Sequence, residues 1–417
     1  MLVYVLNNLG KPLMPCKSQK ARKLLKSKKA KMVKREPFTI QLLYGCSGYK
    51  QEITLGVDTG SKTIGLSATT TKQELFNGKM EIRNDIVDLL SDKRQYRRSR
   101  RNRKTRYRKA RFLNRVKSKH KGWLAPSIEN KIQCHFSIVA KVYKILPISK
   151  MIVETASFDI QKINNPNIQG EEYQQGEQLD FWNVRQYVLF RDSYKCKGRK
   201  NCKNKILNVH HIESRKTGGN APNNLITLCE DCHNDFHSGK LKLNLKRGQS
   251  FKDSTFMGIM RWTFYNRLKE LYPNVSMTYG YITKNTRITN NLPKDHNIDA
   301  FCIANNIKAN MLDYEFYFKK VRCHNRQIHK AKILKGNRRK LNQAPFEVKG
   351  FRLFDKVEYQ SELYYIFGRR SSGFFDIRKL DGTKVNKGSL SCKKIKLIET
   401  RKSILCERRL RDNSSLA

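Results

Sequence analysis

Apolar and polar residues alternate clearly in ITLGVDTGSKTIGLS, residues 53–67, where two apolar runs flank the turn Gly60-Ser61-Lys62. This pattern predicts two strands, with Asp58 at the end of the first. Comparable runs predict strands at 2–6, 38–44, 148–154 and 277–283, and helical spacing predicts helices at 18–35, 137–146, 257–271 and 295–305. From Phe346 onward, short alternating runs with glycine turns predict a small antiparallel β domain. We therefore expect an α/β protein of several domains.

Charge narrows the choice of partner. The 417 residues include 86 Lys plus Arg against 35 Asp plus Glu, which gives a formal net charge of +51. A compact chain with this excess repels itself unless a polyanion neutralises it, and a large nucleic acid is the natural partner. A ribosomal or histone-like packing protein is the simpler alternative.

The densest positive charge lies in KRQYRRSRRNRKTRYRKARFLNRVKSK, residues 93–119, which contains fifteen Lys or Arg and no acid. A solvated helix of this composition repels itself at many i,i+4 pairs, so bound phosphates would be needed to stabilise it. A flexible basic tail is the alternative. Because Tyr96, Tyr107 and Phe112 interrupt the charge with rings that can dock or stack, we expect a helix that contacts nucleic acid.

Four of the eleven cysteines form two pairs. Cys196 and Cys202, together with the Cys229-x-x-Cys232 pair, supply the four thiolates of a closed tetrahedral zinc site. The other cysteines are scattered along the chain, and we expect them to be reduced thiols that pack in the interior. No stretch approaches the ~18 apolar residues of a membrane span. The chain is expected to be cytoplasmic.

The sequence between the cysteine pairs argues against a simple zinc ribbon, because it contains VHHI at 209–212 and NNL at 223–225. This arrangement resembles the ββα-metal pattern of HNH nucleases. The resemblance implies that His211 is the general base and that His210 and Asn224 hold a catalytic Mg²⁺ or orient its water. It adds His233 and His237 as further ligands. Relatives often carry aspartate at the position of His210.

Asp58 itself fits three chemistries: an aspartic protease, an actin-type ATPase or a ribonuclease H-like nuclease. A protease needs two such elements or a homodimer, and an ATPase needs further phosphate and adenosine loops that are not evident here. A two-metal nuclease instead needs acids from separate strands. Glu154 ends an apolar strand, and Asp299 follows His296 by about one helical turn, so both are candidates.

The order of these features resembles the IscB family, transposon-encoded RNA-guided nucleases related to type II CRISPR effectors. LNNLGKPLMP resembles the family's PLMP segment, the arginine-rich run its bridge helix, and GVDTGSKTIGLS, IVETASFD and DHNIDA its three RuvC motifs. The resemblance implies a ribonuclease H-like core split into three segments, with an inserted ββα-metal HNH domain and a C-terminal small antiparallel β domain. It divides the chain into a PLMP domain (1–50), RuvC segment one (51–90), the bridge helix (91–120), RuvC segment two (121–165), a linker (166–178), the HNH domain (179–238), a second linker (239–253), RuvC segment three (254–320) and a C-terminal domain that contacts RNA and a target-adjacent motif (321–417).

Site residues are carried over from the same resemblance. Asp58, Glu154 and Asp299 would hold two Mg²⁺ ions, with His296 as a ligand or proton acceptor. The nucleic-acid contacts of the bridge helix would come from its arginines: Arg94, Arg97, Arg98, Arg100, Arg101, Arg103, Arg106, Arg108, Arg111 and Arg115. Arg369 and Arg370 are candidate contacts in the C-terminal domain.

The resemblance implies a monomeric ribonucleoprotein with a structured guide RNA, the omega RNA. It would bind double-stranded DNA beside a short motif, and its cofactors would be two Mg²⁺ in RuvC, one in HNH and a structural Zn²⁺. HNH would cut the guide-paired strand and RuvC the displaced strand. A structure-specific nuclease without a guide and a non-enzymatic RNA-binding protein remain the alternative functions.

Overall fold

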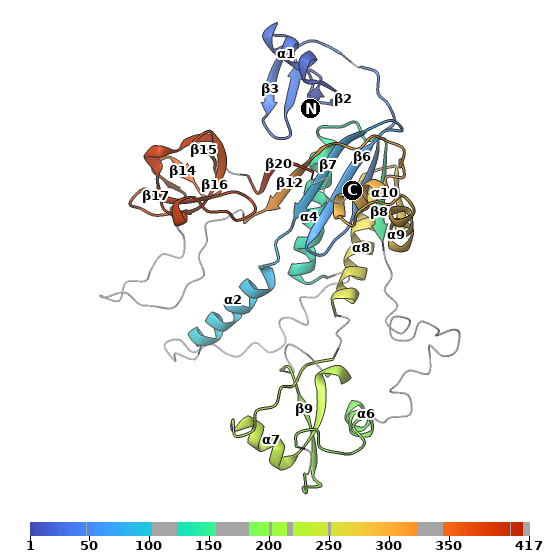
Figure 1. The fold of residues 1–417 in the computed structure, drawn as a ribbon, viewed down its shortest axis with the longest axis vertical. Helices are drawn as coiled ribbons and strands as arrows, with labels where there is room; N and C mark the ends of the chain where they lie inside the picture. Colours follow the sequence, from blue (N-terminus) through green and yellow to red (C-terminus); the bar gives the residue numbers. More distant parts are fainter. Residues whose placement is uncertain are drawn as a thin grey trace. The chain divides into compact units, whose positions relative to one another are not determined.

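The computed structural model describes residues 1–46, 48–101, 123–155, 183–199, 202–214, 220–248, 252–322, 345–400 and 402–411. The chain is a mixed α/β protein (Figure 1) and forms two compact units. Unit 1 consists of Met1–Ala156 and Ile259–Ala417, and unit 2 is the insertion Ser157–Gly258. No helix within the described ranges is long and apolar enough to cross a membrane.

Unit 1 is built around a seven-stranded sheet in the order β11-β8-β5-β6-β7-β12-β20. Its strands are β5 (Thr54–Asp58), β6 (Thr63–Thr69), β7 (Glu74–Glu81), β8 (Lys150–Thr155), β11 (Val275–Tyr279), β12 (Tyr314–Lys320) and β20 (Ile404–Leu410). Strands β5, β6 and β7 form an antiparallel meander, while β8 runs parallel to β5 and β11 runs parallel to β8. Strands from distant parts of the sequence are therefore neighbours in one sheet.

The central strands form where the sequence is almost continuously apolar. Leu55, Val57, Ile64 and Leu66 are fully buried, as expected for strands covered on both faces. Within the described residues, the helices of unit 1 outside the N-terminal sheet are α2 (Ile86–Arg101), α4 (Pro126–Tyr143), α9 (Gly280–Thr289), α10 (His296–Ile303) and the larger part of α8 (Lys252–Leu271), which begins in unit 2. Helix α4 begins with Pro126, a residue suited to the first turn because it has no N–H to leave unpaired.

Helix α10 packs unusually close to the sheet. A Cβ atom at Gly56 would lie 2.0 Å from the carbonyl oxygen of Ala300, and one at Gly65 would lie 1.8 Å from that of His296. Only glycine leaves room for the helix backbone at these two points. The close approach places the first turn of α10 over the end of β5.

Strand pairing in the main sheet explains why one strand predicted from the sequence is shorter than expected. Sequence pattern predicted a strand over 277–283, but β11 ends at Tyr279 and helix α9 begins at Gly280. The parallel pairing of β11 with β8 runs out at Tyr279, which lies opposite Thr155, so the chain is free to form a helix beyond that point. The 277–283 run is apolar enough for either structure, and tertiary pairing decides.

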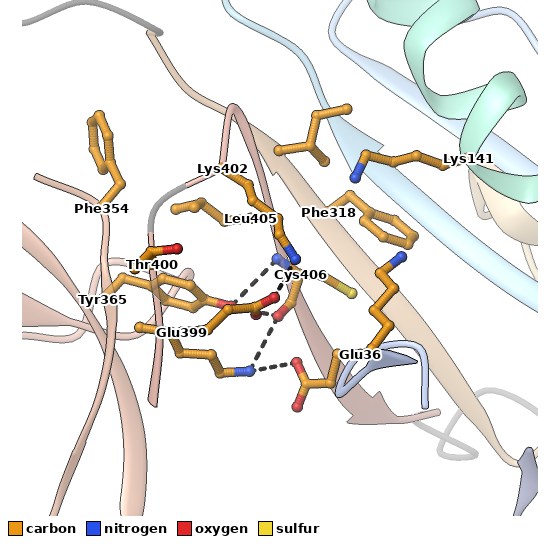
Figure 2. Close-up of a pocket in the computed structure, with 13 residues that line it drawn as sticks. Glu36, Lys141, Phe318, Phe354, Tyr365, Glu399, Thr400, Lys402, Leu405 and Cys406 are labelled. Atoms are coloured by element: carbon orange, nitrogen blue, oxygen red, sulfur yellow. Dashed lines mark hydrogen bonds and ion pairs between the residues drawn. The ribbon is translucent and has the colours of Figure 1, made fainter. Parts of the chain in front are cut away.

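The C-terminal β domain has the small antiparallel sheet that alternation predicted, in the order β18-β17-β16-β15-β19. Its strands are β15 (Lys356–Tyr359), β16 (Glu362–Arg369), β17 (Phe374–Arg378), β18 (Leu390–Ser391) and β19 (Lys396–Glu399), and the hairpin β13 (Glu347–Val348) and β14 (Phe351–Arg352) precedes them. Lys356 forms an ion pair with Glu36 near the N-terminus at 2.5 Å (Figure 2). The last strand, β20, leaves this domain and pairs with β12 in the main sheet.

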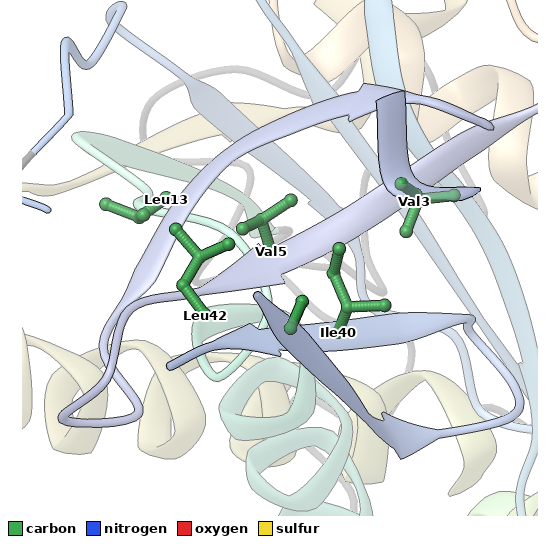
Figure 3. Packing of buried hydrophobic residues seen from close by; sticks show 7 residues of the cluster. Val3, Val5, Leu13, Ile40 and Leu42 are labelled. Carbon is green, nitrogen blue, oxygen red and sulfur yellow. The ribbon is translucent and has the colours of Figure 1, made fainter. Parts of the chain in front are cut away.

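The N-terminal sheet has the order β2-β1-β4-β3 and a small core of its own. Its elements are β1 (Leu2–Leu6), β2 (Pro12–Lys17), α1 (Ser18–Lys26), β3 (Ala30–Lys34) and β4 (Thr39–Leu42). Val3, Val5, Leu13, Ile40 and Leu42 pack together in its interior (Figure 3). The predicted helix over 18–35 is thus wrong in its second half, because a turn with Lys28 at φ 55° ends α1 and β3 then pairs with β4.

Unit 2 is a β hairpin flanked by helices. Strands β9 (Leu207–His211) and β10 (Leu225–Cys229) pair antiparallel, with α6 (Val184–Arg191) before them and α7 (Glu230–His237) after them. The carboxylate of Asp192, directly after α6, accepts a hydrogen bond from the Thr227 N–H at 2.9 Å. This bond holds α6 on the hairpin.

A buried acid in the main sheet makes stability depend on pH. Glu74 is 1% exposed, accepts hydrogen bonds from Ser67 Oγ and the Leu312 N–H, and burial raises its pKa to about 7. Between its unfolded pKa of about 4.3 and pH 7 the folded chain holds a proton that the unfolded chain releases, so stability falls as pH rises through this window.

In glutamine at position 74, the amide oxygen can still accept from the Leu312 N–H, and the amide NH₂ can donate to Ser67 Oγ. We expect Glu74→Gln to raise the free energy of unfolding at pH 8 by roughly 1–3 kcal/mol and to change it little at pH 5. Thermal denaturation of both proteins at the two pH values measures this, with the exposed Glu52→Gln as control. An equal effect at pH 5 and pH 8 would contradict the assignment.

Candidate active sites

Two acids meet at one edge of the main sheet. In the parallel pair β5 and β8, Val57 lies opposite Val153, so Asp58 and Glu154 follow at the same end of neighbouring strands. Both are largely buried, with Asp58 5% and Glu154 8% exposed. The Thr59 hydroxyl donates to the carbonyl oxygen of Glu154 at 2.7 Å and ties the two strand ends together.

The start of helix α10 adds two more groups to this edge. Asp295 caps the helix by accepting from the His296 N–H, and Lys79 pairs with Asp295 at 2.5 Å. The Nδ1–H of His296 donates to Asp58 Oδ2 at 2.6 Å. Asp299 lies one turn further along α10, on the same helix face as His296. The structure therefore brings together all four residues predicted for this site, which we call the carboxylate site.

The acids of the carboxylate site affect one another electrostatically. Burial, and then the neighbouring Asp58, raises the pKa of Glu154 to about 7. Burial and Asp58 also raise the pKa of Asp299, while the hydrogen bond to Asp58 raises the pKa of His296. Like charges brought this close resist ionising together, which favours a bound cation.

Two arginines form ion pairs with acids of the carboxylate site. Arg261 of α8 lies 3.3 Å from Glu154 Oε1 and donates to the Thr59 carbonyl at 2.9 Å. Arg287 of α9 forms an ion pair with Asp299, with its Nε 3.0 Å from Oδ1. Carboxylate oxygens are the ligands that Mg²⁺ prefers, so the kind of donor in the carboxylate site suits this ion, although its three acids do not all lie within 4.8 Å of one another.

Sequence reasoning missed these arginines. Arg261 stands in the largely apolar stretch FMGIMRWTFY, where a charge needs a partner, and that signal could have been noticed. The pairing of Arg287 with an acid twelve positions later depends on how α9 and α10 pack, which the sequence pattern does not reveal.

The four predicted zinc ligands lie together in unit 2. The Sγ atoms of Cys196, Cys202, Cys229 and Cys232 all lie within 4.8 Å of one another. Those of Cys202 and Cys232 are 3.5 Å apart. A disulfide would require about 2.05 Å, whereas four thiolates at about 2.3 Å from one ion lie roughly 3.8 Å apart in a tetrahedron. The cluster fits a structural Zn²⁺.

A second cluster of possible metal ligands lies in the same unit. The ring nitrogens of His210, His233 and His237 lie within 4.8 Å of one another, and burial with its two histidine neighbours lowers the pKa of His210 to about 4. The spacing of four between His233 and His237 places both on one face of α7. A neutral imidazole at His210 keeps a lone pair free for a metal ion. We call these three residues the histidine cluster.

His211 and Asn224 have different surroundings. Successive strand residues point to opposite faces, so His211 is turned away from His210, and its Nε2 lies 3.1 Å from Asn220 Oδ1. Asn224 is buried, accepts from the Glu213 N–H at 2.8 Å and donates to the Glu213 carbonyl at 3.0 Å. In this arrangement the amide of Asn224 braces the loop after His211.

The donor set of the histidine cluster bears on the choice of metal. Imidazole nitrogens suit Zn²⁺ and related transition metals, whereas Mg²⁺ prefers oxygen ligands. Three imidazoles therefore fit a divalent transition metal better than the Mg²⁺ expected from sequence. Within the described residues, these two clusters of unit 2 are the groups of three or more side chains close enough to hold one ion.

The structure covers the predicted nucleic-acid contacts in part. Helix α2 contains Arg94, Arg97 and Arg98, whose side chains are exposed, and also Arg100 and Arg101. Arg103, Arg106, Arg108, Arg111 and Arg115 lie outside the described residues, as does the predicted linker 166–178. In the C-terminal β domain, Arg369 donates to the carbonyl oxygens of Pro345, Phe346 and Phe351, and Arg370 donates to Ser389.

Comparison with known families gives two matches. Residues 3–176 match the model of the RRXRR protein, and residues 195–239 match that of the HNH endonuclease. Residues 97–101 of this chain read RRSRR. Anaredoxin from Nostoc sp. (strain PCC 7120) is 40% identical over 45 residues, which is 11% of this chain and 59% of anaredoxin.

Among solved structures, the type II-C Cas9 enzyme from Actinomyces naeslundii is similar over 61% of this chain and 60% of that chain, with 11% identity and a TM-score of 0.21. A TM-score this low does not establish a shared fold. The HNH match covers the residues of the histidine cluster and the cysteine cluster, so this module is of the HNH endonuclease type. With the RRXRR match, the chain is similar to nucleases of the IscB and Cas9 type, as its motifs predicted.

Proposed function

We propose that this protein is an RNA-guided DNA endonuclease with two nuclease sites. The observation that carries the proposal is the carboxylate site, where Asp58, Glu154, His296 and Asp299 come together from separate parts of the chain. The HNH module is inserted between the second and third of these parts. This is the order expected of a RuvC core split into three segments, with α2 at the start of a bridge helix.

In the HNH module, we propose that His211 is the general base that takes a proton from the attacking water. His210, His233 and His237 would hold a divalent ion, which supplies a Lewis acid for the leaving 3′ oxygen. Asn224 would act as a positioning residue, because its two bonds to Glu213 fix the loop that follows His211. The hydrogen bond between His211 and Asn220 would orient the imidazole ring.

In the carboxylate site, Asp58, Glu154 and Asp299 would hold Mg²⁺, which supplies an activated water and stabilises the leaving oxygen. His296 donates through Nδ1 to Asp58, so its Nε2 is the atom available to accept a proton. Arg261 and Arg287 lie where they can bind the scissile phosphate once the carboxylates bind metal.

Guidance by RNA is proposed because base reading by the protein alone needs recognition elements in a groove, and the sequence has no helix-turn-helix or finger array. A guide supplies this information by pairing, while a basic protein holds the duplex by its backbone. The charge of +51 is suited to that task.

Purification followed by sequencing of bound RNA tests guidance. We expect a structured RNA to co-purify, and cleavage of a matching DNA duplex to require it. Cleavage of branched DNA by RNA-free protein would instead favour a structure-specific nuclease. Absence of any metal-dependent nicking would favour a non-enzymatic RNA-binding protein.

Two histidine variants separate the proposed roles in the HNH module. We expect His237→Ala to lose the ion of the histidine cluster, and His211→Ala to keep it, while each slows cleavage of one strand by about 10²–10⁴-fold. Metal content by mass spectrometry and cleavage of strands carrying different labels measure the two effects. Full metal content in His237→Ala would contradict the ligand assignment, and normal cleavage by His211→Ala would contradict the base assignment.

A further inference from the structure

A small polar cavity in unit 1 is lined by none of the residues of the carboxylate site. It is bordered by Lys34 of β3, Lys141 of α4, Lys356 of β15 and Lys402 beside β20, with Glu36 and Glu399. Figure 2 shows Lys141 on one side of this space and Glu36 and Glu399 on another. The lining residues come from the N-terminal sheet, the main sheet with its helix α4, and the C-terminal β domain. We call it the lysine pocket.

The charges of the lysine pocket do not balance. Lys356 is paired with Glu36 at 2.5 Å, and Lys402 is paired with Glu399. Among the residues that the structure describes, the side-chain ammonium groups of Lys34 and Lys141 have no hydrogen-bond or ion-pair partner. Four ammonium groups thus face two carboxylates, and the two unpaired ones border the same cavity.

The surroundings of these two lysines disfavour their charge. Burial, and then the nearby Lys141, lowers the pKa of Lys34 to about 8, and burial followed by the charge of Lys402 lowers the pKa of Lys141. Burying a charge without a partner costs free energy, and two like charges add to that cost. An anion between Lys34 and Lys141 would remove both penalties.

The size of the cavity limits what can enter. It leaves about 20 Å³ for a solvent-sized group. One water needs roughly 10–15 Å³ on this measure, so an oxygen atom of an anion fits and a nucleobase does not. The wall also includes Phe318 and Tyr365, whose hydroxyl donates to the Cys406 carbonyl, so the lysine ammonium groups are the cationic donors that border the cavity.

We propose that the lysine pocket binds one phosphate group of a nucleic-acid backbone, with a phosphoryl oxygen inserted between Lys34 and Lys141. The proposal rests on the nucleic-acid partner of the proposed function. A phosphate held here contacts residues of the N-terminal sheet and helix α4 at once, beside the ion pair that joins Glu36 to the C-terminal β domain. Nucleic acid bound at this point would therefore link three parts of unit 1.

The salt dependence of binding tests this proposal in the full-length protein. The double variant Lys34→Gln/Lys141→Gln is compared with Lys31→Gln/Lys144→Gln, which changes two exposed lysines on or next to the same elements. Each lost phosphate contact lowers the log-log salt slope by about 0.7–0.9, and the pocket holds one phosphate, so the pocket variant should lose about 0.7–0.9 of slope. Random-sequence RNA and random-sequence duplex DNA serve as probes. An unchanged slope, or an equal loss in the control, overturns the proposal.

A second measurement separates backbone phosphate from free phosphate. In nucleic-acid-free protein, inorganic phosphate should raise the melting temperature relative to chloride at equal ionic strength, and the pocket variant should lose this rise. If inorganic phosphate stabilises the protein through these lysines but the slope for nucleic acid is unchanged, the site is one for free phosphate and the proposal fails. Cleavage assays report separately on the proposed function, because neither lysine lies in a nuclease site.

Discussion

Cys229→Ser is expected to unfold the HNH module and to abolish cleavage of one DNA strand. Cys229 ends β10 and is the N-cap residue of α7, so its thiolate lies where the hairpin meets the helix that carries His233 and His237. The apolar clusters of this module are small. Structural zinc sites contribute about 10–16 kcal/mol of apparent binding free energy in isolated fingers, far more than such a core supplies.

Zinc content and limited proteolysis of residues 183–248 measure the effect of Cys229→Ser. The matched control is Cys46→Ser, which removes a thiol outside the cysteine cluster. We expect the control to keep its zinc, its protease resistance and both cleavage activities. Undiminished zinc and an intact module in Cys229→Ser would show that the four thiols serve only for packing.

Asp58→Asn is expected to stop cleavage of the other strand and leave a nicked product. Asp58 holds His296 through the 2.6 Å hydrogen bond and, after burial, is the largest cause that raises the pKa values of Glu154 and Asp299. Removing its charge removes a metal ligand and the partner of His296 together. A loss of several kcal/mol of transition-state stabilisation corresponds to a rate reduction on the order of 10³-fold or more.

Duplex DNA with a different label on each strand distinguishes nicking from double-strand cleavage. Asp313→Asn serves as the control, because Asp313 is exposed beside β12 of the same sheet. We expect this control to cut both strands. If Asp58→Asn also cuts both strands at the normal rate, the carboxylate site is not a nuclease centre.

The parts of these sites that could be predicted are those fixed by local pattern. Asp58 and Glu154 each end an apolar run, and parallel strands that end together bring such residues to one edge. The cysteine pairs were equally clear, because a tight C-x-x-C accompanied by a second pair of cysteines is typical of a zinc site.

What could not be predicted depends on packing between distant elements. His210, His233 and His237 were all expected as ligands, and they meet because α7 packs against the hairpin. The position of Asn224 was not foreseen, because its amide bonds the Glu213 backbone instead of joining the three histidines. The positions of Arg261 and Arg287 likewise follow from the packing of α8 and α9 beside the sheet.

The two ends of the insertion, unit 2, are joined to unit 1 at positions that lie close together. Unit 2 begins at Ser157, three positions after Glu154, and ends at Gly258, three positions before Arg261. These two residues form an ion pair at 3.3 Å. For the main sheet, the whole of unit 2 is therefore equivalent to a long loop whose two ends lie beside the Glu154–Arg261 ion pair. The entropy of closing such a loop grows only slowly with its length, so evolution or an engineer can lengthen, shorten or exchange the module at little cost to the scaffold.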